Sequence, residues 1–89
     1  MVIVVEHTIT DPDAFFGLAA RVGEAPSGIK AVQFLPSMSR DRAVCLWQAN
    51  SVDALKGFLE SLSAESSRNI YYAVDSTKAM GLPNLAAAA

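Results

Sequence analysis

One histidine is the side chain in this sequence best suited to chemistry at neutral pH. His7 follows the β-branched run VIVV and falls on the same side of an extended chain as Ile3 and Val5. Imidazole titrates near neutral pH, so among apolar neighbours it can serve as an acid or a base. The favoured interpretation is structural: a partly exposed histidine that bonds to a neighbouring carbonyl group. Glu6 has the opposite parity and cannot share a face with His7.

Several other polar and aromatic side chains are candidates for a site around His7. They lie at the ends of apolar stretches, which a sheet can bring to one rim. A small hydrophobic molecule, such as a phenol or a polyketide fragment, can occupy a cleft there, with His7 and a tyrosine contacting its oxygens. The candidate ligand-binding residues are His7, Arg42, Trp47, Asn69 and Tyr72.

Most of these residues also have a purely structural interpretation. Cys45 is expected to be a buried, inert thiol, because no basic residue adjoins it in the sequence. Trp47 suits the core or a subunit interface. Tyr71 and Tyr72 point to opposite faces of a strand, so one can line the cleft while the other meets a partner. Arg42 belongs either to a solvated turn or to an anion clamp at the cleft mouth.

Composition excludes several classes of function. The 89 residues carry a net charge of −2 without a basic cluster, which argues against nucleic acid or an anionic membrane surface as partner. No apolar run approaches the roughly 18–20 residues of a membrane span. The single cysteine cannot form an internal disulfide, so a cytoplasmic location is expected. Gly-rich phosphate loops, paired-cysteine zinc motifs and nucleophile elbows are missing from the sequence.

Four segments are rich in apolar residues on both alternating faces and are bounded by polar or turn-forming residues, as in strands. Ser39–Arg42 is a polar turn that can connect the second and third of them as a hairpin. The predicted strands are Val2–Ile9, Ile29–Leu35, Ala43–Ala49 and Arg68–Asp75.

A first helix is predicted between the first two strands. Asp11 suits its N-cap and Pro12 its first position, where the missing N–H has no cost. Apolar residues follow at helical spacing as far as Val22, and Gly23 fits the position just past the end.

A second helix is predicted after the third strand, where the apolar period changes from two to about 3.6. Asn50 or Ser51 can cap it, Asp53 adds a negative charge to its first turn, and Val52–Leu62 carries one apolar stripe. Beyond the fourth strand, Ser76–Gly81 is expected to form one helical turn.

The order β-α-β-β-α-β predicts an α+β, ferredoxin-like fold: a four-stranded antiparallel sheet, first and third strands central, with two helices on one face. Residues 1–83 form this one domain and 84–89 a flexible tail. Nothing remains in the chain to cover the other, apolar face of the sheet. A homodimer that stacks two such faces is therefore expected.

The strand exit Leu46–Ala49 (LWQA) on such a two-faced sheet resembles the dimeric α/β-barrel superfamily. This group includes antibiotic-biosynthesis monooxygenases, muconolactone isomerases and polyketide cyclases. The segments Val5–His7 and Cys45–Ala49, with a last strand ending near Asp75, are most similar to its small nickel-binding family of otherwise unknown role. The resemblance implies nickel or another divalent metal, with His7 as a ligand. That family is expected to use several histidines, and this chain has one.

Three functions compete on this evidence. The first is a dimeric protein that binds a small hydrophobic molecule or a metal ion near His7. The second is a cofactor-free enzyme, a cyclase, isomerase or monooxygenase, with His7 as catalytic acid or base. The third is an assembly module without a ligand site. The single histidine and the small number of polar residues expected around the cleft favour binding over catalysis.

Overall fold

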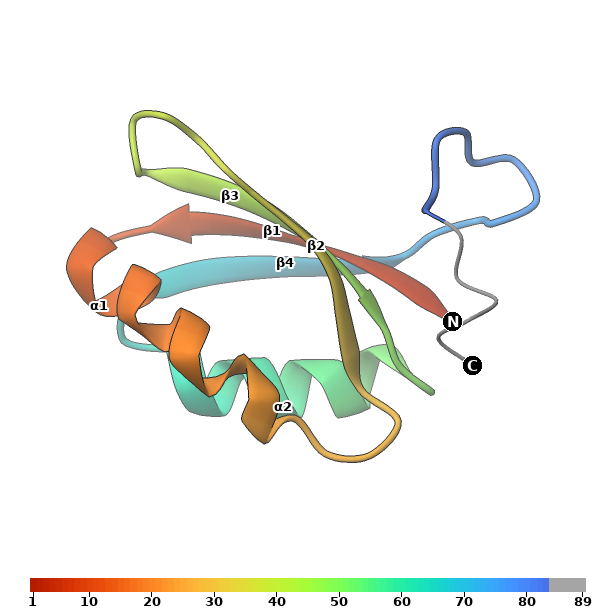
Figure 1. The fold of residues 1–89 in the computed structure, drawn as a ribbon, viewed down its shortest axis with the longest axis horizontal. Helices are drawn as coiled ribbons and strands as arrows, with labels where there is room; N and C mark the ends of the chain where they lie inside the picture. Colours follow the sequence, from red (N-terminus) through yellow and green to blue (C-terminus); the bar gives the residue numbers. More distant parts are fainter. Residues whose placement is uncertain (84–89) are drawn as a thin grey trace.

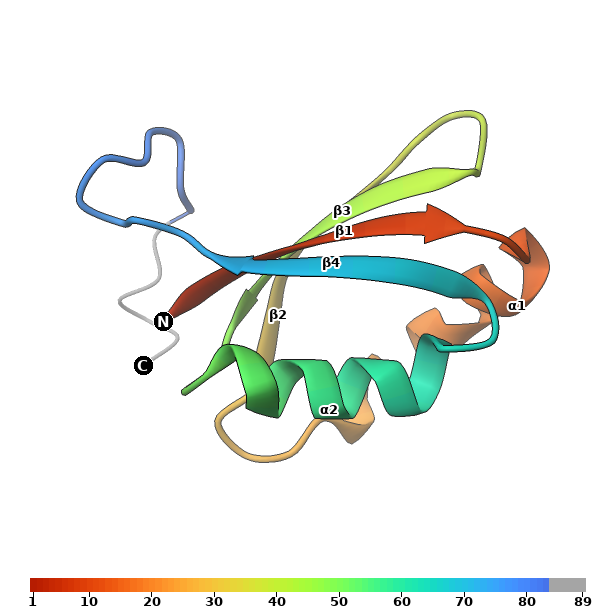
Figure 2. The same cartoon turned by 180° about the vertical axis from the view of Figure 1, so that it is seen from behind.

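The computed structural model describes residues 1–83 and has the expected ferredoxin-like architecture (Figure 1). Its sheet is antiparallel, in the order β2-β3-β1-β4, so the first and third strands are central as predicted. The two helical segments lie on one face of this sheet (Figure 2). The strands are β1 (Val2–Ile9), β2 (Lys30–Pro36), β3 (Arg42–Gln48) and β4 (Ser67–Ala73).

Both helices begin where their capping residues predict. Asp11 is the N-cap of α1 (Pro12–Gly17) and accepts a hydrogen bond from the Ala14 amide at 3.2 Å. Ser51 rather than Asn50 is the N-cap of α2 (Val52–Ser63), and its hydroxyl accepts from the Ala54 amide at 3.0 Å. These bonds pair amides that have no partner within the helix.

The first helix differs from the prediction beyond its second turn. The α-helix ends at Gly17 and continues as a 3-10 helix, η1 (Leu18–Glu24), so Gly23 lies within a helical turn and does not terminate it. Glycine is a weak helix former, and tighter 3-10 turns are common at the end of an α-helix. None of the η1 residues is buried, so this part of the helical layer covers the sheet only loosely.

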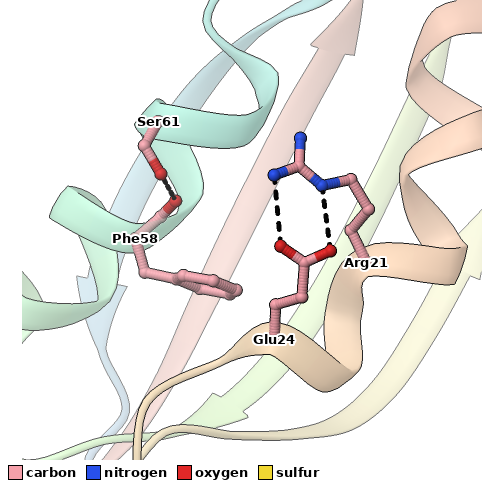
Figure 3. Close-up of polar contacts among 4 residues, drawn as sticks. All are labelled: Arg21, Glu24, Phe58 and Ser61. Carbon is pink, nitrogen blue, oxygen red and sulfur yellow. Dashed lines mark hydrogen bonds and ion pairs between the residues drawn. The ribbon is translucent and has the colours of Figure 1, made fainter.

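The end of η1 lies beside α2 (Figure 3). Arg21 donates two hydrogen bonds of 3.1 Å to the Glu24 carboxylate, and the Phe58 ring of α2 faces the same space. The Arg21–Glu24 pair is exposed to solvent and lies within η1, so it does not attach η1 to α2. Apolar contacts of Val22 and Phe58 with the core supply that attachment.

A β-bulge in β2 changes which face of the sheet each of its side chains occupies. Simple alternation along the strand would place Ala31 with Leu35 and opposite to Phe34. The register instead sets Ala31 against Trp47 and Phe34 against Cys45, with a shift between Ala31 and Gln33. An extra residue reverses the alternation beyond it. Ala31 and Phe34 therefore share the helix-covered face, while Leu35 is on the open face.

The segment after β4 also differs in detail. The strand ends at Ala73, two residues before its predicted end. Only residues 76–78 form a turn, and it is Asp75 that closes it, accepting backbone hydrogen bonds from Lys78 and Ala79. The expected helical turn through Gly81 is absent. The predicted tail, 84–89, lies outside the described residues.

The core lies between the sheet and α2. Ile3, Val5 and Leu55 are fully buried at its centre. The opposite face of the sheet leaves several apolar side chains exposed, among them Leu35, Val44, Ile70 and Tyr72. In residues 1–83, neither helix has the length and apolar character that crossing a membrane requires.

Candidate functional site

An apolar pocket of about 280 Å³ lies between the sheet and the helical layer. Its walls come from β1, β2 and β3 on one side and from α1, η1 and α2 on the other. Only four lining side chains carry a polar atom. The lining residues are His7, Phe15, Phe16, Leu18, Ala19, Val22, Ala31, Gln33, Phe34, Cys45, Trp47, Leu59 and Leu62.

Aromatic rings form the wall beside His7. The Phe15 ring packs edge-on against the imidazole, with 5.0 Å between ring centroids. Phe16 and Phe34 complete the cluster, at 5.6 and 6.2 Å from Phe15. Phe34 joins it because of the β2 bulge, so the bulge helps to shape the pocket.

The strand register gives His7 a partner on each ring nitrogen. Asn69 is directly opposite His7 on β4, and its Oδ1 lies 2.6 Å from Nδ1. Cys45 is opposite Val5 on β3 and so is a diagonal neighbour of His7 on the same face, with Sγ 3.2 Å from Nε2. His7 itself is 4% exposed. Cys45 is buried, as the sequence predicts, but the imidazole of another strand adjoins its thiol.

A second layer of hydrogen bonds fixes the orientation of the Asn69 amide. Its Nδ2 donates to Glu60 Oε2 at 2.6 Å and to Ser63 Oγ at 3.0 Å. The Tyr71 hydroxyl donates to the same Glu60 oxygen at 2.6 Å, and this bond lowers the pKa of Glu60. An ionised carboxylate only accepts hydrogen bonds, so the amide nitrogen must face it. The amide oxygen is then left for Nδ1–H of His7.

Burial keeps both members of the His7–Cys45 pair uncharged. Removal from water lowers the pKa of His7, although the Asn69 hydrogen bond and Glu60 oppose this effect. Burial also raises the pKa of Cys45 to about 11, and the nearby Trp47 side chain offsets part of the rise. Both shifts disfavour a thiolate–imidazolium pair. The geometry is therefore that of a neutral thiol next to the bare Nε2 of a neutral imidazole.

The predicted ligand-binding residues separate into two groups. His7 and Trp47 line the pocket, and Asn69 supports His7 from β4. Arg42 is paired with Thr8, and Tyr72 with Val4, so both lie on the open face of the sheet away from the pocket. Tyr71, not Tyr72, is on the helix side.

Trp47 presents a polar group without a partner. The side chain is 3% exposed, and its indole N–H is buried without a hydrogen-bond acceptor among residues 1–83. Buried donors without partners are rare in proteins. The sulfur of Cys45 lies near the indole and is only a weak acceptor, and other atoms of Trp47 contribute to the pocket wall.

The described residues do not fit a metal ion. Within residues 1–83, no group of three or more histidine, cysteine, aspartate or glutamate side chains converges on one point. His7 has only Cys45 as a second donor of suitable type, and Nδ1 is held by Asn69. Nickel and zinc sites need more protein ligands than this pair provides.

Sequence reasoning missed Glu60 and most of the aromatic wall. Glu60 adjoins the apolar residue Leu59 on α2, but its contact with Asn69 depends on how α2 packs against β4, which no local pattern encodes. Simple alternation puts Phe34 on the wrong face, because a bulge leaves little signal in a short strand.

No protein-family model, curated protein or solved structure matches this chain.

Proposed function

We propose that this protein binds a small, largely apolar molecule in the pocket beside His7. The observation that carries the proposal is the pocket itself. It is lined almost entirely by apolar and aromatic side chains, and only four of its lining side chains carry a polar atom. Ligand pockets in proteins typically have this character, and about 280 Å³ is near the small end of their range.

Binding is favoured over thiol chemistry by the charge state of the site. A cysteine nucleophile needs a substantial thiolate fraction. With the pKa of Cys45 raised to about 11, the thiolate fraction at pH 8 is on the order of one in a thousand. His7 does not compensate, because its own pKa is lowered.

A cofactor-free enzyme with His7 as general base is the second candidate. It is favoured by one observation: Asn69 holds Nδ1, which leaves an oriented, neutral Nε2 facing the pocket residue Cys45. This is the arrangement of a histidine prepared to take a proton. Turnover of a bound compound, lost in His7→Gln while its binding persists, would favour this candidate over simple binding.

We also propose that the protein acts as a homodimer through the open face of the sheet. Leu35, Val44, Glu6 and Ile70 lie in register across all four strands, and three of these four side chains are apolar. Leu35 is 59% exposed and Ile70 64% exposed in the single chain. A second copy presents the same apolar row and so covers it with a surface of matching character.

The single tryptophan provides a direct test of ligand binding. The ¹⁵N–¹H spectrum of the protein contains one indole N–H signal, because Trp47 is the only tryptophan. We expect naphthalene to shift this signal in a saturable manner. Ala19→Leu, which places a larger side chain in the pocket wall, should weaken binding at least about tenfold, since the volume is small.

Ala20→Leu is the matched control, because Ala20 is the exposed neighbour of Ala19 and does not line the pocket. Its affinity for naphthalene should equal that of the wild type. A flat titration of the wild-type indole signal, or equal affinities of both leucine variants and the wild type, would refute the binding function.

A further inference from the structure

The polar side chains of the pocket wall have a defined hydrogen-bonding character, and a residue outside the pocket sets it. His7, Cys45 and Trp47 all line the pocket, and Cys45 adjoins both His7 Nε2 and the Trp47 side chain. Glu60 does not line the pocket but controls the proton on His7 through Asn69. This inference rests on the proposed binding function and specifies its ligand.

The Glu60 carboxylate fixes the orientation of the Asn69 amide. Glu60 Oε2 accepts hydrogen bonds of 2.6 Å from both Asn69 Nδ2 and the Tyr71 hydroxyl. Reversing the Asn69 amide would place its oxygen against the carboxylate, where two acceptors repel each other. The Ser67 hydroxyl, which donates to Asn69 Oδ1 at 2.8 Å, stabilises the same orientation.

The orientation of the Asn69 amide in turn determines which nitrogen of the His7 imidazole carries the proton. Asn69 Oδ1 can only accept a hydrogen bond, so His7 must carry its proton on Nδ1. Nε2 is left with a lone pair. Its present neighbour is the Cys45 thiol, a weak donor, and a hydroxyl group is a stronger donor that can take its place.

The oxygen of such a hydroxyl also has a partner. Apart from the sulfur of Cys45, which is a weak acceptor, the buried indole N–H of Trp47 lacks an acceptor among residues 1–83. A hydroxyl can donate to His7 Nε2 and accept from Trp47, whereas an ether or ketone oxygen can only accept. The remaining walls are apolar, so they suit a hydrocarbon or aromatic body.

We propose that Glu60, acting through Asn69, is the positioning residue that makes the pocket select apolar molecules bearing one neutral hydroxyl group, such as phenols, over ethers and hydrocarbons of the same shape. A phenol satisfies both polar atoms at once. An ether leaves Nε2 with only the weak Cys45 thiol as a donor, and a hydrocarbon also leaves the Trp47 N–H without an oxygen acceptor. Selection thus depends on hydrogen bonds and not on size.

The ligand preference is tested first on the wild-type protein. We expect 2-naphthol to bind about three- to tenfold more tightly than 2-methoxynaphthalene, which accepts but does not donate, because one net hydrogen bond is worth roughly this factor. Naphthalene should bind no more tightly than the ether. If all three compounds bind with the same affinity, the binding function stands and the hydroxyl selection is wrong. If none binds, the function proposed above fails as well.

The role of Glu60 is tested by locating the proton on His7. The chain has one histidine, so ¹⁵N labelling of histidine gives signals from a single ring. We expect Nδ1 to be protonated and Nε2 bare in the wild type. Glu60→Gln removes the charge that orients Asn69, so Nε2 should gain proton occupancy and the preference for 2-naphthol over the ether should fall towards one.

Glu65→Gln is the matched control, since Glu65 is an exposed carboxylate just beyond α2. It should leave both the proton position and the preference as in the wild type. A purely structural role of Glu60 would lower stability without moving the proton. A proton on Nε2 in the wild type, or an unchanged proton position and preference in Glu60→Gln, would overturn the proposal.

Discussion

His7 is the residue in which the fold and the site are most closely connected. It occupies a core position of β1, between Val5 and Ile9, yet it is ionisable. The fold tolerates it because Asn69 accepts from one nitrogen and Cys45 adjoins the other, so no polar atom of the ring is left unpaired. This arrangement holds only while the ring is neutral.

The stability of the protein should consequently depend on pH through His7. Burial lowers the pKa of His7 below its value in the unfolded chain, about 6.5. The neutral ring therefore contributes stability that is present above about pH 6.5. This stability is lost as the pH falls through the unfolded pKa towards the folded one. Between pH 7 and 5 the free energy of unfolding, measured with urea, should fall with a slope of up to about 1.4 kcal/mol per pH unit.

His7→Gln provides the comparison, because glutamine does not titrate. Tyr71, Cys45 and Glu60 surround the ring, and above pH 5 the first two stay neutral while Glu60, whose pKa is lowered, stays ionised. The variant should be less stable at pH 7 but nearly independent of pH over this interval. Equal slopes in the variant and the wild type would show that His7 is not held neutral by burial.

At the scale of elements, the helical segment formed by α1 and η1 packs only loosely against the sheet. Gly17 marks the change from α-helix to 3-10 helix, and the η1 residues beyond it line the pocket without being buried. If α1 continued as an α-helix packed tightly against the sheet, less room would remain between the helices and the sheet. The end of α1 at Gly17 therefore helps to leave space for the pocket.

Two glycine substitutions should affect stability in opposite directions. Gly17 has φ −64° and no atom within 4 Å of an added Cβ, so Gly17→Ala should raise the free energy of unfolding by about 0.4–1 kcal/mol. Gly28 has φ +91°, which alanine adopts only with strain, so Gly28→Ala should lower it by about 1 kcal/mol or more. Urea unfolding of both variants measures this; a loss of stability in Gly17→Ala would contradict the helical backbone at that position.

The elements were more predictable than the site. Caps and apolar periods are local signals, so Asp11 and Ser51 located both helix starts, and β1 was predicted with its observed ends. Parity alone placed His7 on the same face as Ile3 and Val5. The expected strand order also grouped Asn69 with His7, and the two are hydrogen-bonded in the structure. The contact of Asn69 with Glu60 depends on how α2 packs against β4, which a sequence pattern cannot supply.

At the scale of the whole molecule, the two faces of the sheet serve different purposes. One face holds the core and the pocket. The other is the apolar row of Leu35, Val44 and Ile70, interrupted by Glu6. A chain of 89 residues buries only about 60–65% of its unfolded surface, so covering this row with the proposed second copy would add stability.

The dimer can be tested with a substitution that does not disturb the single chain. Ile70→Arg changes an exposed side chain, so the monomer should keep its fold, while the dimer would have to bury unpaired charges. Light scattering at micromolar concentration should give twice the mass of one chain for the wild type. The dissociation constant of the variant should be at least about 100-fold weaker.

Ala54→Arg introduces the same charge on the exposed surface of α2 and serves as the control. It should scatter light as the wild type does. A wild-type mass equal to that of one chain would end the homodimer proposal. It would leave the pocket untouched, because the described residues of one chain form all of its walls.

The bulge in β2 has a consequence for how such a pocket can change during evolution. Phe34 reaches the pocket wall because one extra residue separates it from Ala31. The alternation of apolar and polar residues in the sequence does not indicate this position. Loss of a single codon near Val32 would turn the neighbouring side chains over and give the wall a different residue. Ligand preference in descendants of this chain can thus shift by an insertion or deletion in an edge strand, with every helix and buried residue unaltered.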